Sequence, residues 1–192
     1  GCTLADILLG KVNPSGKLNV SFPRSTGNTP CFYNHFVTDR EESFDQPGTP
    51  EEPKGHYIFD KPEPLWNFGH GKSYTTFDYV DCALSDTLLV ASDTLKVSVT
   101  IKNTGRRDGK EVVQLYVRDK VSTVATPIQQ LKAFQKVLIK PGESQCVELS
   151  LPIAELALYN AKMEEVVEPG DFEIQIGAAS DDIRFKKTIT IN

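Results

Sequence analysis

The stretch that decides the fold is "VTIKNTGRRDGKEVVQLYVRD", residues 99–119. Apolar residues take every second position on both sides of a turn signal, Asn103-Thr104-Gly105. They are Val99 and Ile101 before the turn, and Val113, Leu115 and Val117 after it. Such alternation predicts a strand with one buried face, and glycine and asparagine between two such runs predict a turn. Two consecutive strands therefore follow from this stretch alone.

The same pattern extends over residues 77–192 and predicts about seven short strands. Extended or alternating runs occur at residues 74–79, 97–101, 113–117, 131–137, 147–151, 172–176 and 185–191, and "PIAEL" (152–156) predicts one helical turn. Many short strands separated by turns indicate an all-β fold, an antiparallel β-sandwich of the immunoglobulin or fibronectin type III kind. Trp66 lies outside this region, so the Cys-Trp-Cys arrangement of antibody domains is absent.

Residues 1–76 show far less regular structure. In "CTLADILLG" (2–10), Leu4, Ile7 and Leu8 have helical spacing, which predicts the last two turns of an amphipathic helix. So short a helix is marginal by itself, and we expect it to be the remnant of an α/β domain from a longer protein. After a turn signal at residues 13–16, Leu18, Val20 and Phe22 alternate and predict one strand.

A long irregular loop is predicted from residue 24 to residue 64. It is rich in Pro, Gly, Thr, Asn and acidic residues, and aromatic residues are interleaved with them. Loops of this length are usually functional or disordered, and the aromatic content favours a loop packed against another part of the protein. The expected division is residues 1–23 as the end of the α/β domain, 24–76 as linker and interdomain loop, and 77–192 as the sandwich.

Composition and charge exclude two classes of partner. The 192 residues carry a net charge of -5, and the Lys and Arg residues are scattered. A nucleic-acid partner normally requires a basic stripe, so none is expected. The apolar runs, such as residues 137–139, are too short to cross a membrane, so no membrane span is expected.

The four cysteines, at positions 2, 31, 82 and 146, lack the C-x-x-C spacing of a zinc or redox site. We expect Cys82 and Cys146, in predicted strands, to be small buried hydrophobic residues. The spacing leaves the redox compartment undetermined.

The stretch "NFGHGKSYTTF" (67–77) imitates a phosphate-binding loop without being one. The motif G-x-x-x-x-G-K-[ST] would need its first glycine at position 66, which is Trp66. A helix must also follow the loop, because phosphates bind at a helix N-terminus, whereas residues 74–79 predict a strand. Nucleotide binding is therefore excluded at this stretch.

No complete active site is predicted from the chemistry of the side chains. The acids Asp39, Glu41, Glu42 and Asp45 are expected to be solvated in the loop, and Glu111, Glu148 and Glu173 to be solvated on the outward phase of strands. Asp60 and Glu63 flank aromatic residues and are better candidates for a ligand contact. His35, His56 and His70 lack metal-ligand spacing, and Ser73 lacks a nucleophile motif. Hence no catalytic residue, metal or cofactor is expected.

Several segments in order resemble the C-terminal end of glycoside hydrolase family 3 enzymes, the β-glucosidases and β-xylosidases. They are "LADILLGKVNPSGKLNVSFP" (4–23), "EPLWNFGHGKSYTTFDY" (63–79), the opening stretch, "LKAFQKVLIKPGES" (131–144) and "VEPGDFEIQIGAAS" (167–180). The family usually has leucine where Lys72 stands, so a half-buried Lys72 would have to extend its ammonium group into water.

The resemblance implies a retaining exo-glycosidase that forms a covalent glycosyl intermediate. It places the aspartate nucleophile and the acid/base in domains before Gly1, so this chain alone would be inactive. It also implies upstream catalytic domains of the same polypeptide as partners, an oligo- or polysaccharide substrate, and a periplasmic or secreted location.

On this basis residues 67–77 are interpreted as an interdomain joint. Gly69 and Gly71 permit backbone turns closed to other residues, and Phe68, Tyr74 and Phe77 provide apolar packing area. Trp66 and His70 are alternative candidates for contact with a sugar.

Two other functions remain open from the sequence. A carbohydrate-binding module would need an exposed aromatic strip, and the sandwich has few spare aromatic residues, chiefly Tyr116 and Tyr159. A structural sandwich with no attached enzyme would not explain the helix remnant and the aromatic loop.

Overall fold

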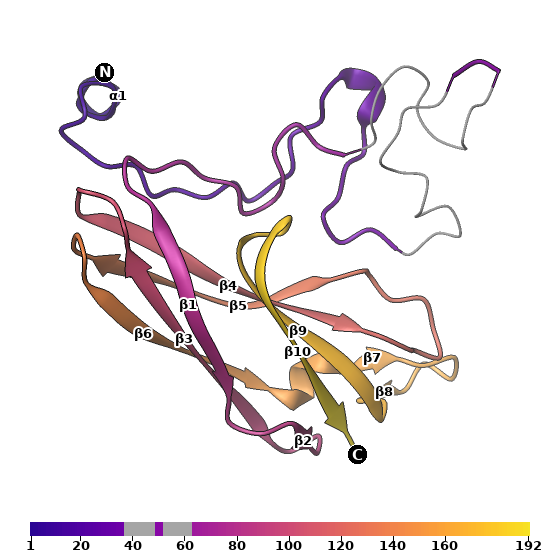
Figure 1. Cartoon of the computed structure of the whole chain (residues 1–192). Helices are drawn as coiled ribbons and strands as arrows, with labels where there is room; N and C mark the ends of the chain where they lie inside the picture. Colours follow the sequence, from indigo (N-terminus) through magenta and orange to yellow (C-terminus); the bar gives the residue numbers. More distant parts are fainter. Residues whose placement is uncertain (37–48, 52–62) are drawn as a thin grey trace.

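The computed structural model describes residues 1–36, 49–51 and 63–192. Two β-sheets face each other and form a sandwich, so the chain has the all-β fold expected from the sequence (Figure 1). A five-stranded sheet has the order β2 (Leu88–Leu89), β10 (Asp182–Ile191), β9 (Gly170–Ala179), β4 (Gly109–Asp119), β5 (Gln130–Ile139). A three-stranded sheet has the order β1 (Phe77–Leu84), β3 (Thr94–Asn103), β6 (Ser144–Pro152).

Short elements complete the fold. The helical turn η3 (Ile153–Leu156) leads into the two-residue strands β7 (Leu158–Tyr159) and β8 (Glu165–Val166). All strand pairs are antiparallel except that of β2 with β10. The N-terminal part, defined here as the described residues before β1 (1–36, 49–51 and 63–76), contains α1 (Cys2–Leu8) and the turn η1 (Thr26–Asn28).

The core lies between the two sheets and follows from the alternation in sequence. Val97, Val99 and Ile101 of β3 are 0% exposed and face Val113 and Leu115 of β4, also 0% exposed. The burial of apolar side chains between the sheets stabilises the fold, by about 25 cal/mol for each Å² of apolar surface removed from water. The helical turn at "PIAEL" and the strands predicted from residue 97 onward are confirmed. The run predicted at residues 74–79 becomes a strand only from Phe77, and the short strands β2, β7 and β8 were not predicted.

Strand β5 departs from the simple pattern. Val137 is buried, but Phe134 is 66% exposed. Residues three apart cannot share a face of a strand, whose period is two. The pairing with β4 also shifts by one residue, because Leu115 lies opposite Ala133 and Tyr116 lies opposite Leu131.

Cys82 is 4% exposed, as expected, whereas Cys146 is exposed and the expectation for it is wrong. Cys146 lies between Gln145 and Val147 on β6, and Val147, Leu149 and Leu151 take the inward positions of that strand. All four cysteines are free.

The N-terminal part forms a two-stranded ribbon, here defined as residues 18–22 paired with residues 65–70. Backbone N–H groups of Phe22 and Leu18 donate to Trp66 and His70 carbonyl oxygens at 2.8 Å, and Gly69 N donates to Leu18 O at 2.7 Å. The predicted strand at 18–22 is thus limited to an isolated bridge, Phe22 with Trp66. Figure 1 shows these two segments side by side along the upper side of the sandwich.

Helix α1 forms as predicted, but none of its side chains is buried. Residues 13–16 form no turn, contrary to the turn signal.

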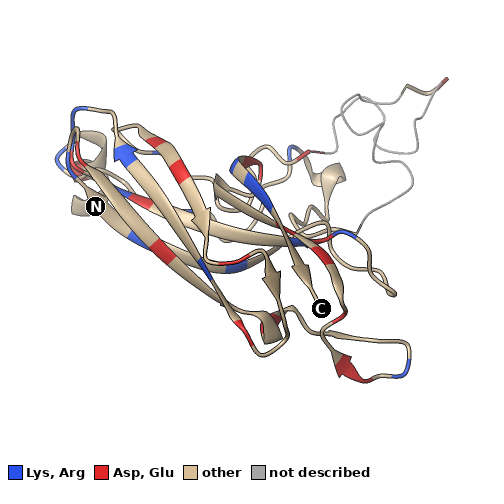
Figure 2. Ribbon diagram, turned by 60° about the horizontal axis from the view of Figure 1, so that its bottom comes forward, with Lys and Arg blue, Asp and Glu red and all other residues tan. Residues whose placement is uncertain are grey.

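Charged side chains of both signs are interspersed over the described residues (Figure 2). In the part of the chain that the structure describes, no helix has the length and apolar character needed to span a membrane.

Candidate functional site

The ribbon contacts the sandwich closely at Gly69. This residue is buried and has φ +81°, a left-handed conformation that favours glycine. A Cβ atom here would lie 2.3 Å from Gln114 Oε1 and 3.0 Å from Ala179 Cα. Glycine is therefore required at position 69 both by the backbone conformation and by the approach of the sandwich.

The side-chain amide of Gln114 holds this contact together. Its Nε2 donates to Ala178 O at 2.6 Å and to Gly69 O at 3.4 Å, and its Oε1 accepts from the Tyr116 hydroxyl at 2.5 Å. Gln114 is 2% exposed and Tyr116 is 0% exposed. A buried amide is favourable only when its donors and acceptors are paired, so this network fixes the position of the ribbon.

Aromatic rings cover the polar network. Tyr33 stacks on Phe68 with centroids 4.1 Å apart and meets the edge of Tyr116 at 6.0 Å. The Tyr33 hydroxyl accepts a hydrogen bond from Leu131 N of β5 at 3.3 Å. The ring stack keeps water from the Gln114 amide and adds apolar contact area between the N-terminal part and the five-stranded sheet.

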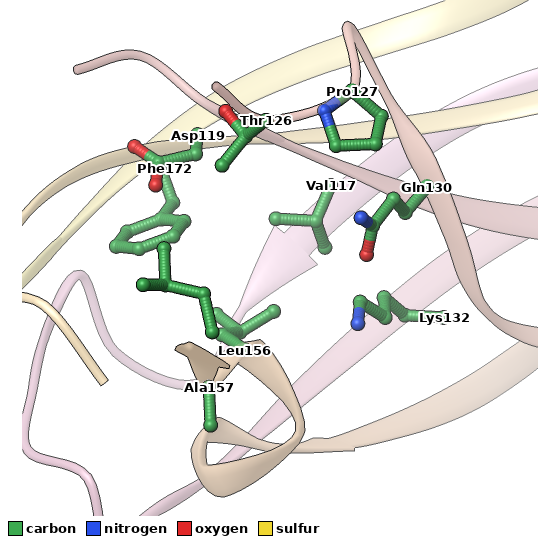
Figure 3. Close-up of a pocket in the computed structure, with 10 residues that line it drawn as sticks. Val117, Asp119, Thr126, Pro127, Gln130, Lys132, Leu156, Ala157 and Phe172 are labelled. Carbon is green, nitrogen blue, oxygen red and sulfur yellow. The ribbon is translucent and has the colours of Figure 1, made fainter. Parts of the chain in front are cut away.

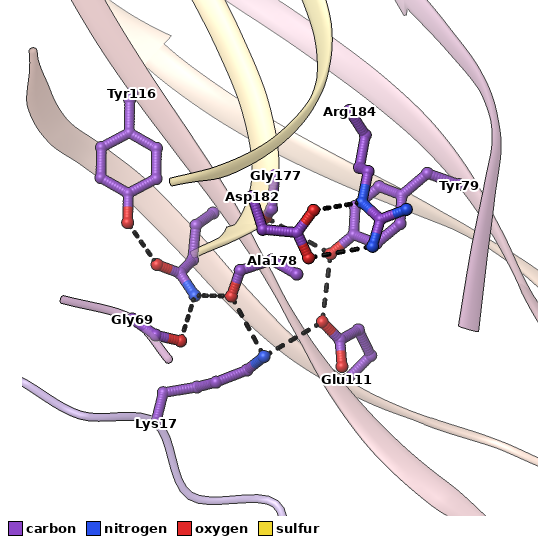
Figure 4. Close-up of polar contacts among 10 residues, drawn as sticks. Lys17, Gly69, Tyr79, Glu111, Tyr116, Gly177, Ala178, Asp182 and Arg184 are labelled. Carbon is purple, nitrogen blue, oxygen red and sulfur yellow. Dashed lines mark hydrogen bonds and ion pairs between the residues drawn. The ribbon is translucent and has the colours of Figure 1, made fainter. Parts of the chain in front are cut away.

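A charged cluster lies nearby, where the two sheets meet the N-terminal part (Figure 4). Lys17 Nζ lies 3.3 Å from Glu111 Oε1 and donates to Ala178 O at 3.1 Å. The Tyr79 hydroxyl donates to Glu111 Oε1 at 3.2 Å and lies 3.3 Å from Gly177 O. Strands β1, β4 and β9 and the N-terminal part are thus joined by one cluster.

The expectation of a solvated Glu111 is wrong, because Glu111 is 6% exposed. It has the phase of Val113, Leu115 and Val117 on β4, whose side chains point into the core. Glu111 lies at the start of the strand, where Lys17 and Tyr79 replace the apolar contacts found further along. By contrast, the exposed Glu148 forms a surface ion pair with Lys96 at 3.6 Å.

Burial raises the pKa of Glu111, and the ammonium group of Lys17 and the hydrogen bonds from Lys17 and Tyr79 oppose this rise. Burial, and then the charge of Glu111, raise the pKa of Tyr79 far above its usual range. Tyr79 therefore remains a neutral hydrogen-bond donor at physiological pH.

A second set of contacts anchors α1. Asn13 Oδ1 accepts from Tyr74 N at 2.8 Å and Ser73 Oγ at 3.0 Å, and Asn13 Nδ2 donates to Asp108 O at 2.8 Å. The Tyr74 hydroxyl donates to Ile7 O at 2.8 Å, and the Arg107 guanidinium lies 5.7 Å from the Tyr74 ring centroid. Asn13, the first residue of the predicted turn at 13–16, therefore links the segment after α1 to residues 73–74 and to Asp108 by hydrogen bonds of its side chain.

The predicted joint residues have different surroundings. Phe68 and Gly69 contact the sandwich, Tyr74 contacts α1, and Phe77 begins β1 and packs against the core. A Cβ on Gly71 would meet Gly16 O at 2.5 Å, so the close approach there is within the N-terminal part. Lys72 is exposed, so its side chain does not have to cross apolar surface to bring its ammonium group into water.

The two sugar-contact candidates have different surroundings in the structure. Trp66 is 46% exposed and packs edge-on against Phe22 with ring centroids 5.8 Å apart. His70 lines a pocket of about 380 Å³ together with Lys17, Tyr79 and Glu111.

Other candidates give no further site. The exposed Glu63 accepts a hydrogen bond at its backbone oxygen from Arg24 Nε at 3.0 Å. Glu173 accepts from Gln175 Nε2 at 2.7 Å. Asp39, Glu41, Glu42, Asp45, His56 and Asp60 lie outside the described residues. Within residues 1–36, 49–51 and 63–192, no three His, Cys, Asp or Glu side chains are grouped to hold a metal ion.

A smaller pocket, of about 60 Å³, lies near η3 between Val117, Leu156 and Phe172 (Figure 3). Asp119 and Lys132 also line it, and burial raises the pKa of Asp119 and lowers the pKa of Lys132. Lys132 donates to Glu155 O at 2.7 Å. The volume is about that of two waters in the liquid, which is too small for an organic ligand.

The described sandwich presents no aromatic strip of the kind that a carbohydrate-binding module needs. Tyr116 is buried, Tyr159 is 59% exposed on β7, and Phe134 is 66% exposed on β5, a strand of another sheet. The fold and the joint instead define a fibronectin type III-like sandwich that holds a docked N-terminal segment.

Comparison with known proteins identifies the family. Residues 1–74 match the glycosyl hydrolase family 3 C-terminal domain, and residues 111–180 match the fibronectin type III-like domain. The chain belongs to glycoside hydrolase family 3, as part of the C-terminal region of such enzymes. The resemblance inferred from sequence is confirmed.

The relatives are glycosidases of greater length. A periplasmic β-glucosidase of Salmonella typhimurium is 40% identical over 94% of this chain and 23% of its own length. A β-xylosidase of Formosa agariphila is 41% identical over 96% of this chain and 24% of its own length. A crystal structure of the Listeria innocua β-glucosidase with glucose has a TM-score of 0.83 at 38% identity, covering 98% of this chain and 26% of that one. The chain thus spans about a quarter of the length of the relatives that it matches.

The close approach at Gly69 predicts that Gly69→Ala destabilises the protein more than Gly142→Ala. Both glycines have positive φ, +81° and +77°, but a Cβ on Gly142 meets nothing within 4 Å. Each substitution costs about 1–2 kcal/mol for the backbone, and the overlap at Gly69 adds about 1–3 kcal/mol. Urea unfolding of the two variants measures the difference, and equal losses would show that Gly69 does not contact the sandwich as described.

The burial of Glu111 predicts that the folded protein loses stability as pH rises and the Glu111 carboxyl ionises. Because its folded-state pKa is raised, the folded protein holds more protons than the unfolded chain between the two pKa values. The free energy of unfolding, relative to Glu111→Gln, should fall as pH rises from about 4.3 through the folded pKa, by about 1.4 kcal/mol for each pH unit that separates the two pKa values. Glu148→Gln is the exposed control. The prediction is contradicted if the free energy of unfolding of the wild type, minus that of Glu111→Gln, stays constant or increases as pH rises over this range.

Proposed function

We propose that this chain is the C-terminal accessory region of a retaining exo-β-glycosidase that removes terminal β-linked glucose or xylose. The names of the relatives, β-glucosidase and β-xylosidase, support the two sugars. The family resemblance supports a covalent glycosyl intermediate and places the aspartate nucleophile and the acid/base in upstream domains. The part performed by this chain is to support those domains and to shape the rim of the cleft.

The observation that carries the proposal is the exposed apolar surface of the N-terminal part. Leu4, Leu8 and Leu9 are 63%, 72% and 71% exposed at α1, and Trp66 and Val20 of the ribbon are 46% and 55% exposed. A short amphipathic helix is stable only when its apolar face is packed, and exposed apolar groups of this kind mark contact sites. Upstream catalytic domains of the same polypeptide are the partner that we infer for this surface.

In this proposal the interdomain joint, residues 67–77, fixes the position of the upstream domains relative to the sandwich. Residues 1–23 complete the α/β domain, residues 24–76 form the linker, and residues 77–192 form the accessory sandwich. Phe68, Gly69, Gly71, Tyr74 and Phe77 are then interdomain packing residues. Trp66 and His70 are the residues of this segment proposed to contact a sugar.

Neither of the two proposed catalytic groups is assigned to a residue here. The buried carboxylate Glu111 is engaged by Lys17 and Tyr79. A periplasmic or secreted location is part of the proposal and is supported by the periplasmic relative from Salmonella.

Hydrolysis of p-nitrophenyl β-glucoside and β-xyloside tests the proposed function. We expect no turnover by the purified 192-residue chain and turnover of at least one substrate by the product of the complete gene. The preferred substrate identifies the sugar. A mock purification from cells without the gene controls for host enzymes. Turnover by the 192-residue chain above that control would refute an accessory role, and inactivity of both proteins on both substrates would refute the glycosidase assignment.

A further inference from the structure

The larger pocket lies between the N-terminal part and the sandwich. Lys17 and His70 line it from the N-terminal part, and Tyr79, Glu111 and Arg184 line it from strands β1, β4 and β10. Its volume of about 380 Å³ lies within the range of about 300–1,000 Å³ for small-molecule sites.

One oxygen of the Glu111 carboxylate in this pocket receives no hydrogen bond from the described residues. Glu111 Oε1 accepts from both Lys17 Nζ and the Tyr79 hydroxyl, whereas Oε2 accepts from none of them. Figure 4 shows the two interactions converging on one oxygen. The Glu111 side chain is 8% exposed. Oε2 is not among the fully buried unpaired atoms of the described residues, so a donor in the pocket, from water or from a ligand, can reach it.

The charges that line the pocket select the class of ligand. Three cationic side chains, Lys17, Lys72 and Arg184, are matched by three anionic ones, Glu111, Asp181 and Asp182. Lys17 is ion-paired with Glu111 and Arg184 with Asp182, so the lining carries no net charge and favours neither an anion nor a cation. A hydroxyl group both donates and accepts, so a neutral ligand with several hydroxyl groups suits a lining of mixed donors and acceptors.

The pocket also offers apolar surface. Phe77 and Tyr79 line it and are partly exposed, and the Arg184 guanidinium lies 5.9 Å from the centroid of the Tyr79 ring. Aromatic surface with a few convergent polar groups is the usual composition of a small-molecule site. The C–H groups of a sugar ring can pack on such a surface while its hydroxyl groups meet the charged side chains.

We propose that this pocket binds a neutral saccharide of one or two sugar units. Glu111 Oε2 accepts from a ligand hydroxyl, and Lys17 and His70 donate to ligand oxygens. The inference deepens the proposed function and rests on it for the sugar contact of His70, which it extends to Lys17 and Glu111. Its test measures binding and not hydrolysis, so the two proposals can fail separately.

The test is an NMR titration of the ¹⁵N-labelled 192-residue chain with D-glucose, D-xylose and cellobiose. We expect saturable shifts of the backbone amides of Gly71, Glu111 and Ala179 with at least one sugar. Loss of a hydrogen bond to a charged group should weaken binding about tenfold or more in Glu111→Gln. Glu148→Gln removes an exposed carboxylate elsewhere and should bind as the wild type does.

A second variant keeps the test decisive if Glu111→Gln does not fold. His70→Ala removes a side chain that lines the pocket and leaves the backbone hydrogen bonds of the ribbon in place. It should also weaken binding. The proposal is overturned if no sugar gives saturable shifts, or if the folded variants bind as tightly as the wild type. It is equally overturned if ethylammonium chloride saturates the pocket and the sugars do not.

Discussion

The buried amide of Gln114 is the interaction on which the rest of the structure depends. It joins Gly69 of the ribbon, Ala178 of β9 and Tyr116 of β4 in one network that is closed to water. An amide in such a place stabilises one arrangement strongly, because any displacement leaves a donor or an acceptor unpaired. The left-handed glycine at position 69 follows from this constraint.

The charged cluster of Lys17, Tyr79 and Glu111 is a second contact between the N-terminal part and the sandwich, at the end of the sandwich. The apolar core ends there, and Glu111 takes an inward position in β4 that apolar residues occupy further along. A buried ion pair contributes little net stability but is costly to break, so it specifies position more than it stabilises the fold. The pocket proposed to bind a sugar exists because these polar groups, and not a packed apolar core, fill this end.

The sequence predicted the strands of the sandwich well, because each depends on local alternation that β3 and β4 show clearly. The joint was predicted only in outline. Glu111 was expected on the outward phase of its strand, although it has the same phase as Val113 and Leu115, which were expected to face inward. The contacts of Tyr33 with Tyr116, of Asn13 with Tyr74 and of residue 18 with residue 70 join segments far apart in the chain. Such contacts leave no periodic pattern, so they become visible only in three dimensions.

The most direct test of the account is hydrogen exchange at the two amides that fix the ribbon. Gly69 N donates to Leu18 O, and Ser180 N donates across the joint to Phe68 O. If the joint is part of the cooperative fold, both amides should exchange as slowly as that of Leu115 in the core. Val121 N, bonded to the Asp119 side chain in an exposed loop, is the rapidly exchanging control. Exchange of Gly69 and Ser180 as fast as Val121, with Leu115 still protected, would show that the ribbon opens independently and would contradict the account.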